Sequence, residues 1–222
     1  MKSVLLAVSA LVTFAGAANA QPSEGPQPAP MPPAIAQPRD VAFPGTMRVE
    51  VDASDLAQRI FRVKQTIPVA QAGRMTLLYP EWLPGNHAPR GMVDRVAGLV
   101  FRVNGQVLPW TRDPVDVYAF HIDVPQGAST VEAEFQFLTP TSGDQGRILV
   151  TPDMLNLQWE DVSLYPAGYF TRRIMVEPVV RLPAGFSHAS ALEPATTENG
   201  VTRFKPVTYE TLVDSPMFAG RY

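Results

Sequence analysis

Histidine and carboxylate side chains are the groups of this chain that could do chemistry, because it contains no cysteine. A zinc peptidase site would need two histidines one helical turn apart, usually as H-E-x-x-H with the glutamate as general base. The histidines His87, His121 and His188 are instead scattered, and neither H-E-x-x-H nor the G-x-S-x-G turn of serine hydrolases occurs. A metal site built from His87, His121 and carboxylates is an alternative that the spacing of these residues does not support. We predict no catalytic and no metal-binding residue in this chain.

Carboxylates also stand next to two tryptophans. Glu160 and Asp161 follow Trp159, and Glu81 precedes Trp82. A pair of acids beside aromatic rings is found in glycoside hydrolases, where the distance between the two carboxyl groups sets the mechanism. A sequence does not give that distance, and acidic residues near strand ends are usually solvated. We therefore rank an independent hydrolase last among the functions open to this chain.

Two of the histidines, His121 and His188, are expected at positions without a chemical role. His121 alternates with Ala119 and Asp123, so its side chain should point outward from a strand into solvent. His188 lies in the loop-like stretch FSHAS, without a partner at metal-ligand spacing. Neither position indicates chemistry.

The most specific local feature is the segment 79–91, YPEWLPGNHAPRG. Its two aromatic residues, three prolines and two glycines predict a rigid, shaped loop. The residues alone favour a structural role, in which the loop closes one end of the domain and Trp82 fills the core. The functional alternative is a stiff rim that contacts a substrate or a neighbouring domain. The candidate rim residues are Trp82, Pro84, Gly85, Asn86, His87 and Arg90.

Apolar and polar residues alternate with a period of two in the segments that must position these residues, which is the pattern of β-strands. Met47, Val49 and Val51 alternate with charged residues, and the same alternation covers 61–69, 118–124 and 131–137. Further strands are expected at 75–79, 99–103 and 173–181, with Pro178 indicating an edge strand or a bulge. Strands with one wet face are typical of antiparallel sheets.

Turn signals separate these strands. Asn104-Gly105 and Asn199-Gly200 predict hairpins because both residues tolerate positive φ, and Gln126-Gly127 separates two of the clearest strands. Short helical turns are expected near 89–96 and 208–213. The predicted fold class is all-β, either an antiparallel β-sandwich or a strongly twisted two-sheet domain with short helical turns.

The N-terminal region predicts export. Lys2, an apolar run at 4–18 and Ala18-Asn19-Ala20 form a cleavable signal peptide at residues 1–20, and the run is shorter than a membrane-spanning helix requires. Residues 21–44 contain eight prolines and predict a disordered tether. The domain is expected at residues 45–222, in a periplasmic or secreted protein that does not stay in the membrane after signal cleavage.

Charge and composition exclude several classes of protein. The formal net charge is −3, and it becomes about −4 without the first twenty residues, which hold one lysine and no acid. No basic stripe for nucleic acid or anionic membrane is present. Because the chain lacks cysteine, no disulfide can hold it together, and packing must stabilise the fold.

At the rim segment the sequence resembles a known family. Trp82-x-Pro84-Gly85 followed by Arg90 is similar to the N-terminal β-domain of the glycyl aminopeptidase family of zinc metallopeptidases. Other segments fit the same pattern in order and spacing. They are WTRDP at 110–114, VYAF at 117–120, LQW at 157–159, YPAGY at 165–169 and LVDSP at 212–216. The resemblance covers residues 46–222, although many relatives carry tyrosine where this chain has His87.

The resemblance implies a modular exported enzyme. In the family the β-domain precedes a thermolysin-like domain with H-E-x-x-H and a downstream glutamate, often followed by a PDZ-like domain. The enzyme removes N-terminal residues such as Gly or Ala from peptides. In this chain LVDSP matches the stretch that leads into the catalytic domain, and no position is present for the zinc ligands. We therefore interpret the chain as a non-catalytic N-terminal domain, seen as a fragment.

This interpretation sets the expected cofactor and partners. The chain itself should hold no cofactor, with zinc in the missing catalytic domain, and its partners should be that domain in cis and a peptide substrate. An alternative is a free-standing periplasmic β-sandwich that binds peptide or carbohydrate through residues 82–90. An independent hydrolase is the third possibility.

Overall fold

The structure is a computed structural model that describes residues 25, 28–83, 85–145 and 149–221. Its contacts divide the chain into two units, Met1–Met31 and Pro32–Tyr222. The predicted signal peptide at residues 1–20 lies outside the described residues. No helix in the described ranges is long and apolar enough to span a membrane.

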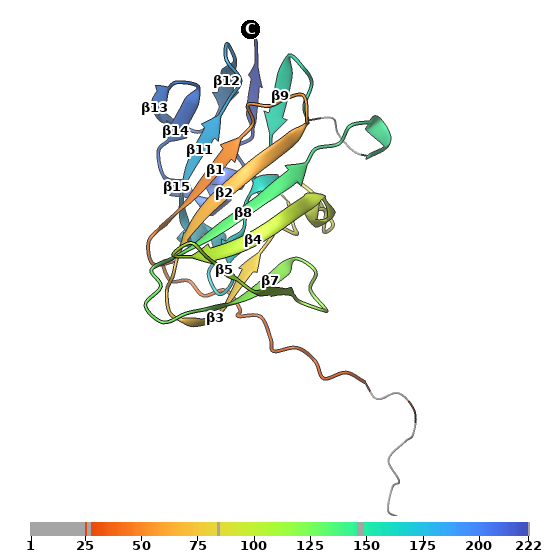
Figure 1. The fold of residues 1–222 in the computed structure, drawn as a ribbon, viewed down its shortest axis with the longest axis vertical. Helices are drawn as coiled ribbons and strands as arrows, with labels where there is room; N and C mark the ends of the chain where they lie inside the picture. Colours follow the sequence, from red (N-terminus) through yellow and green to blue (C-terminus); the bar gives the residue numbers. More distant parts are fainter. Residues whose placement is uncertain (1–24, 26–27, 84, 146–148, 222) are drawn as a thin grey trace, which may run out of the picture. The chain divides into compact units, whose positions relative to one another are not determined.

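The second unit is built mainly of strands arranged in three sheets (Figure 1). The largest sheet has the strand order β13-β14-β11-β1-β2-β8-β4-β5, and β15 also pairs with β11. Its strands are β1 (Thr46–Asp52), β2 (Ile60–Pro68), β4 (Val96–Val103), β5 (Gln106–Leu108), β8 (Thr130–Leu138), β11 (Met175–Arg181), β13 (Pro194–Glu198), β14 (Val201–Phe204) and β15 (Val207–Thr208).

Two smaller sheets complete this unit. One has the order β10-β3-β7-β6 and the other the order β12-β16-β9. Their strands are β3 (Gly73–Leu78), β6 (Trp110–Arg112), β7 (Ala119–Val124), β9 (Met154–Leu157), β10 (Tyr165–Pro166), β12 (Ser187–Ser190) and β16 (Met217–Gly220). The helical turns are η1 (Val93–Arg95), η2 (Gly143–Gln145), η3 (Trp159–Val162), η4 (Thr171–Arg173) and α1 (Tyr209–Val213). The prediction of an all-β fold with short helical turns is confirmed.

The period-two pattern explains the large sheet. Met47, Val49 and Val51 of β1 point into the core, and the residues between them stay partly exposed. Burial alternates in the same way along β2 and β8, which pair over their whole length. The pair β1–β11 is parallel, and the other named strand pairs of the described residues are antiparallel.

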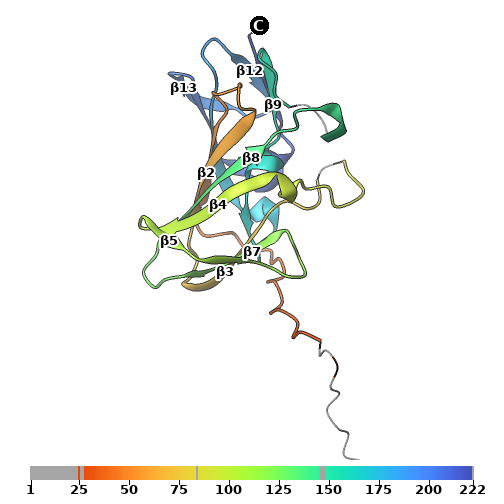
Figure 2. The same ribbon diagram turned by 45° about the vertical axis from the view of Figure 1, so that its right-hand side comes forward.

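Aromatic side chains pack the large sheet against the sheet that contains β3 and β7. The Trp110 ring makes edge-to-face contacts with Phe101 of β4 and Phe120 of β7, at centroid distances of 6.5 and 5.5 Å. Figure 2 shows β3 and β7 as a layer of their own beside β4 and β5. Such edge-to-face packing adds to the free energy gained by burying the rings.

Both predicted hairpins are present. Asn104-Gly105 joins β4 to β5 with φ of 49° and 77°, and Asn199-Gly200 joins β13 to β14 with φ of 51° and 75°. Gln126-Gly127 separates β7 from β8, as expected, and because these strands belong to different sheets it forms a crossover between them. The turn residues identify the reversal of the chain but not the strand to which it returns.

Pro178 does not lie in an edge strand. β11 pairs with β1 on one side, whereas on the other side β14 pairs with 179–181 and β15 with 175–176. Glu177 and Pro178 therefore face a break between two short partner strands. A proline is tolerated there because its missing N–H would have no ladder partner on that side.

The end of the predicted tether contacts the domain. The Arg39 N–H donates to the Gly168 carbonyl at 3.1 Å, and Asp40 forms ion pairs with Arg172 and Arg173. Phe43 is only 5% exposed and packs edge-to-face on Tyr169. A tether at residues 21–44 stays a prediction, and its residues 39–43 make these contacts within the second unit.

Candidate functional site

The segment 79–91 follows β3 and folds back on itself. The carbonyl of Glu81 accepts hydrogen bonds from the N–H groups of Arg90 and Gly91 at 2.9 and 3.0 Å, and Trp82 forms an isolated bridge with Pro89. The Trp82 side chain is 63% exposed. The expectation that Trp82 fills the core is therefore wrong, because the hairpin-like return of the segment places it outside the packed sheets.

The base of this rim is held by Tyr118. The N–H of Tyr79 donates to the Tyr118 carbonyl at 2.8 Å, and the Tyr118 hydroxyl donates to the Gly91 carbonyl at 3.3 Å. A Cβ atom on Gly91 would lie 1.9 Å from the Pro80 oxygen and 3.1 Å from the Tyr118 ring. Gly91 is therefore required by close approach, and any side chain there would separate the two ends of the rim.

Trp82 lines one wall of a cavity of about 310 Å³. This volume is at the lower end of the range of small-molecule sites. Leu83 also lines the cavity, whereas the described rim residues Gly85, Asn86, His87 and Arg90 do not. Pro84 lies outside the described residues. The described residues that line the cavity are Pro80, Trp82, Leu83, Glu160, Tyr165, Thr171, Tyr209, Glu210 and Val213.

Glu160 is the buried carboxyl group of this cavity. It belongs to η3, it is 9% exposed, and its Oε2 atom has no hydrogen-bond partner among the described residues. Burial, with a smaller contribution from the charge of Asp214, raises the Glu160 pKa to about 7, although a backbone hydrogen bond opposes the shift. A buried carboxyl oxygen without a hydrogen-bond partner is costly, so this atom is a candidate point of contact for a ligand or another domain.

Asp161 is buried beside Glu160. Its exposure is 3%, and burial together with the Glu160 charge raises its pKa well above the usual range. The expectation that these two acids are solvated is wrong. The turn η3 follows the buried strand β9, and all four of its residues are buried, so the acids cannot turn outward. The sequence signal for this was Trp159, a large apolar residue that begins the turn and is fully buried.

Hydrogen bonds hold η3 in place. The Ser163 hydroxyl donates to the Trp159 carbonyl at 2.6 Å, so the Tyr209 hydroxyl, 2.8 Å away, must donate to Ser163. The Tyr79 hydroxyl donates to the Asp161 carbonyl at 3.1 Å. Burial raises the pKa of Tyr79 and of Tyr209 well above the usual range, so both phenols stay protonated donors.

Acidic and aromatic groups together give the cavity its chemistry. Glu160 and Glu210 supply carboxyl groups, and Trp82, Tyr165 and Tyr209 supply rings. Among the described residues that line it there is no lysine, arginine or histidine. Ammonium and guanidinium groups bind to such surroundings, because ring faces and carboxylates both attract cations. The cavity is therefore suited to a cationic ligand group.

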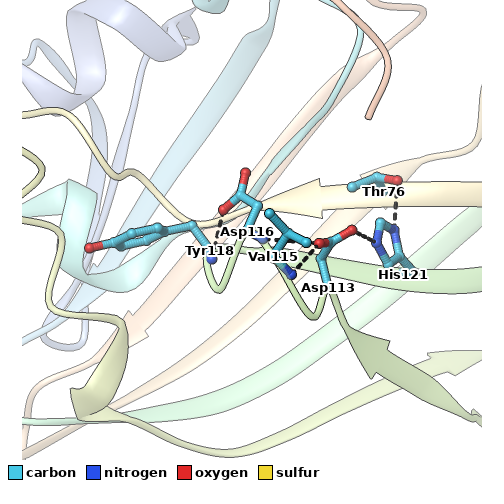
Figure 3. A network of polar contacts seen from close by, with 6 residues as sticks. All are labelled: Thr76, Asp113, Val115, Asp116, Tyr118 and His121. Atoms are coloured by element: carbon cyan, nitrogen blue, oxygen red, sulfur yellow. Dashed lines mark hydrogen bonds and ion pairs between the residues drawn. The ribbon is translucent and has the colours of Figure 1, made fainter. Parts of the chain in front are cut away.

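A second polar cluster, shown in Figure 3, lies in the sheet of β3 and β7. His121 Nε2 is 2.9 Å from Asp113 Oδ2, and His121 Nδ1 is 2.9 Å from Thr76 Oγ1. His121 and Asp113 are 7% and 3% exposed. The expectation of a solvated His121 is wrong, because Asp113 covers the face of β7 that the alternation assigned to solvent.

The cluster satisfies its own polar atoms. Hydrogen bonds from the N–H groups of Asp116 and Val115, together with the contact to His121, lower the Asp113 pKa to about 2, so this carboxyl is ionised. Nε2 of His121 then donates to Asp113, and in a neutral ring Nδ1 accepts the Thr76 hydroxyl proton. The geometry is that of a structural network. Thr76 does not line the cavity that contains Trp82 and Glu160.

A zinc ion does not fit the described residues. They contain no group of three or more His, Cys, Asp or Glu side chains that could hold a metal ion. His87 lies on the exposed rim and His188 on β12, where it packs against Phe204. Zinc sites need three or four such ligands.

Fold and site together define a β-domain with an acidic, aromatic-lined cavity beneath an exposed rim. Residues 48–221 match the family described as the Peptidase M61 N-terminal domain. The chain therefore belongs to this family, which confirms the resemblance to a peptidase N-terminal domain. No curated protein matches the chain.

The chain is also similar to solved structures, and the first of those named here shares its fold. An aminopeptidase N family protein from Idiomarina loihiensis matches with a TM-score of 0.65 and 18% identity, covering 79% of this chain and 29% of that one. An M1 zinc metallopeptidase from Deinococcus radiodurans matches with a TM-score of 0.45 and 13% identity, covering 86% and 44%. Yeast LTA4 hydrolase in complex with bestatin matches with a TM-score of 0.47 and 10% identity, covering 82% and 28%. The chain thus spans less than half the length of each.

Proposed function

We propose that this chain is the N-terminal domain of an exported zinc aminopeptidase, that it packs on a catalytic domain, and that it shapes the substrate cleft. Membership of the Peptidase M61 N-terminal domain family supports the domain assignment. Zinc belongs to the catalytic domain in this proposal, because the described residues offer no set of three ligands. The substrate is a peptide, and neither nucleic acid nor membrane is a partner of the mature domain.

The cavity under Trp82 gives the domain its part in substrate binding. The observation that carries this proposal is the buried Glu160, which shares the cavity with an exposed tryptophan and whose Oε2 has no hydrogen-bond partner in the part of the chain that the structure describes. A peptide presents a terminal ammonium group, which a carboxylate binds by charge-assisted hydrogen bonds and a tryptophan face attracts. Glu160 would thus accept the ammonium group, with Trp82 as one wall of the cleft.

Titration with glycinamide, a small primary amine without a carboxylate, tests this step. We expect chemical-shift changes at Trp82 and Tyr165 in the NMR spectrum, and we expect Glu160→Gln to weaken the affinity about tenfold or more. Glu198→Gln, an exposed residue of β13, makes the same charge change elsewhere and should bind normally. Equal binding by wild type and Glu160→Gln would refute the assignment of the cavity.

The absence of catalysis by this chain is a separate expectation. The purified chain with added zinc should release no aminoacyl reporter from Gly or Ala substrates, because it supplies no H-E-x-x-H. Turnover that disappears with a chelator and copurifies with this chain would favour the independent hydrolase instead. Tight binding of whole peptides or sugars by the chain alone would favour the free-standing binding domain.

Export has its own test. Expression with the native N-terminus in a bacterium should give a periplasmic protein that begins near Gln21, as measured by mass spectrometry of the mature chain. An intact Met1 in the cytoplasm would contradict the proposed signal peptide and the periplasmic or secreted location.

A further inference from the structure

Hydrogen bonds connect the loop between β6 and β7, residues 113–118, to the buried cluster of Figure 3. Asp113 Oδ1 accepts the N–H groups of Val115 and Asp116, both at 2.9 Å, and Asp116 Oδ1 accepts the N–H of Tyr118 at 3.0 Å. The Arg112 guanidinium adds a hydrogen bond to the Val117 carbonyl at 2.7 Å. Side-chain acceptors of this kind fix a turn more firmly than its backbone bonds alone.

The cluster also anchors this loop to the interior. His121 of β7 bonds Asp113 on one side and Thr76 of β3 on the other, so one buried histidine joins two strands and the start of the loop. Because Asp113 and His121 are nearly inaccessible, solvent screens their interaction little. The loop therefore has a fixed position relative to β3, the strand from which the rim continues.

Tyr118 connects this loop to the rim by hydrogen bonds. Tyr118 is the last residue of the loop. Its carbonyl accepts a hydrogen bond from the Tyr79 N–H, where the rim begins. Its hydroxyl and ring contact Gly91, where the rim ends. Tyr118 thus touches both ends of the segment that carries Trp82. No charged side chain of the cluster reaches the cavity itself, since neither Asp113 nor His121 lines it.

We propose that Asp113 and His121 are positioning residues for the rim: they hold the 113–118 loop so that Tyr118 fixes both ends of the rim and sets Trp82 as a wall of the Glu160 cavity. The effect on ligand binding rests on the proposed function, whereas the effect on the rim does not. In this arrangement the histidine that looked like a candidate metal ligand is a structural support of the binding site.

Spin labelling tests the position of the rim without any ligand. Because the chain has no cysteine, His87→Cys places a single label on the exposed rim, and Thr196→Cys places one on exposed β13 as a reference. We expect Asp113→Ala to increase the mobility of the label at position 87 and to leave the label at 196 unchanged. Asp123→Ala, which removes an exposed aspartate from the same strand as His121, should change neither.

A conservative substitution separates positioning from general stability. Asp113→Asn keeps an oxygen that can accept from Val115 and Asp116, and its amide can donate to Nε2 once the His121 proton moves to Nδ1. It should therefore restore the immobile label at position 87. Should Asp113→Ala fail to fold, Tyr118→Ala removes the last link with the cluster intact, and it should mobilise the same label.

The outcomes distinguish this proposal from the proposed function. Equal mobility of the label at position 87 in wild type, Asp113→Ala and Tyr118→Ala would overturn the positioning role, and so would equal loosening at positions 87 and 196. With native histidine at position 87, Asp113→Ala should weaken glycinamide binding about tenfold. A mobile rim with unchanged glycinamide affinity would uphold the positioning of the rim and contradict Trp82 as a binding wall.

Discussion

At the scale of single residues, Glu160 and Asp161 set this domain apart from an ordinary β-sandwich. Burial of an acid is tolerated in proteins when a cation or a set of donors compensates it. Here neither acid has a cationic partner in the described residues, and burial raises the pKa of both. Burying these acids lowers the free energy of unfolding, a loss of stability that is common at functional sites.

The cost of Glu160 should be measurable as a pH dependence of stability. Unfolded glutamate ionises near pH 4.5, whereas the buried one keeps its proton to about pH 7, so the folded state loses stability as pH rises between these values. Glu160→Gln should therefore be more stable than wild type at pH 8 by about 3 kcal/mol, and by much less at pH 5. Urea unfolding at both pH values measures the difference. A constant difference, or a less stable variant at pH 8, would contradict the buried ionised state.

At the scale of elements, turn chemistry decides how strands are joined. Asn104 and Asn199 adopt positive φ at the two hairpins that the sequence predicted, and each is followed by glycine. Non-glycine residues pay a steric penalty in this region, which asparagine tolerates better than most. These two hairpins were predictable because the signal is local.

Substitution of Asn104 tests that local signal. Asn104→Ala should lower the free energy of unfolding by about 1 kcal/mol, because alanine is strained at a φ of 49°. Asn104→Gly, which is free to adopt this angle, should stay close to wild type in the same urea titration. A normal Asn104→Ala with a destabilised Asn104→Gly would show that packing, not φ, governs the turn.

At the scale of the whole molecule, three sheets and the segment before β1 form the second unit of the chain. The segment belongs to it through Phe43 on Tyr169 and the Asp40 ion pairs with Arg172 and Arg173. Thr171, which precedes Arg172 in the chain, is one of the residues that line the cavity. Residues 39–43 thus pack on the domain beside a residue that lines the cavity.

Two shortened chains measure this contribution. A chain that begins at Pro32 should unfold like the full chain, whereas one that begins at Gly45 should lose about 3 kcal/mol, mainly from the buried Phe43 ring. Thermal denaturation of the two chains in parallel gives the comparison. Equal stability would show that residues 32–44 act only as a spacer.

The sequence by itself determined the features that depend on neighbouring residues: alternating strands, two Asn-Gly hairpins, a loop at 79–91, and the spacing of the histidines. Tertiary structure alone decided what surrounds each side chain. It buried His121 and Glu160, exposed Trp82, and placed Pro178 at an interrupted ladder. Period-two alternation assigns a face to each residue, but whether that face meets water depends on segments far away in the chain. Asp113 covers His121 and η3 carries Glu160 inward, so the site exists only after those distant segments meet.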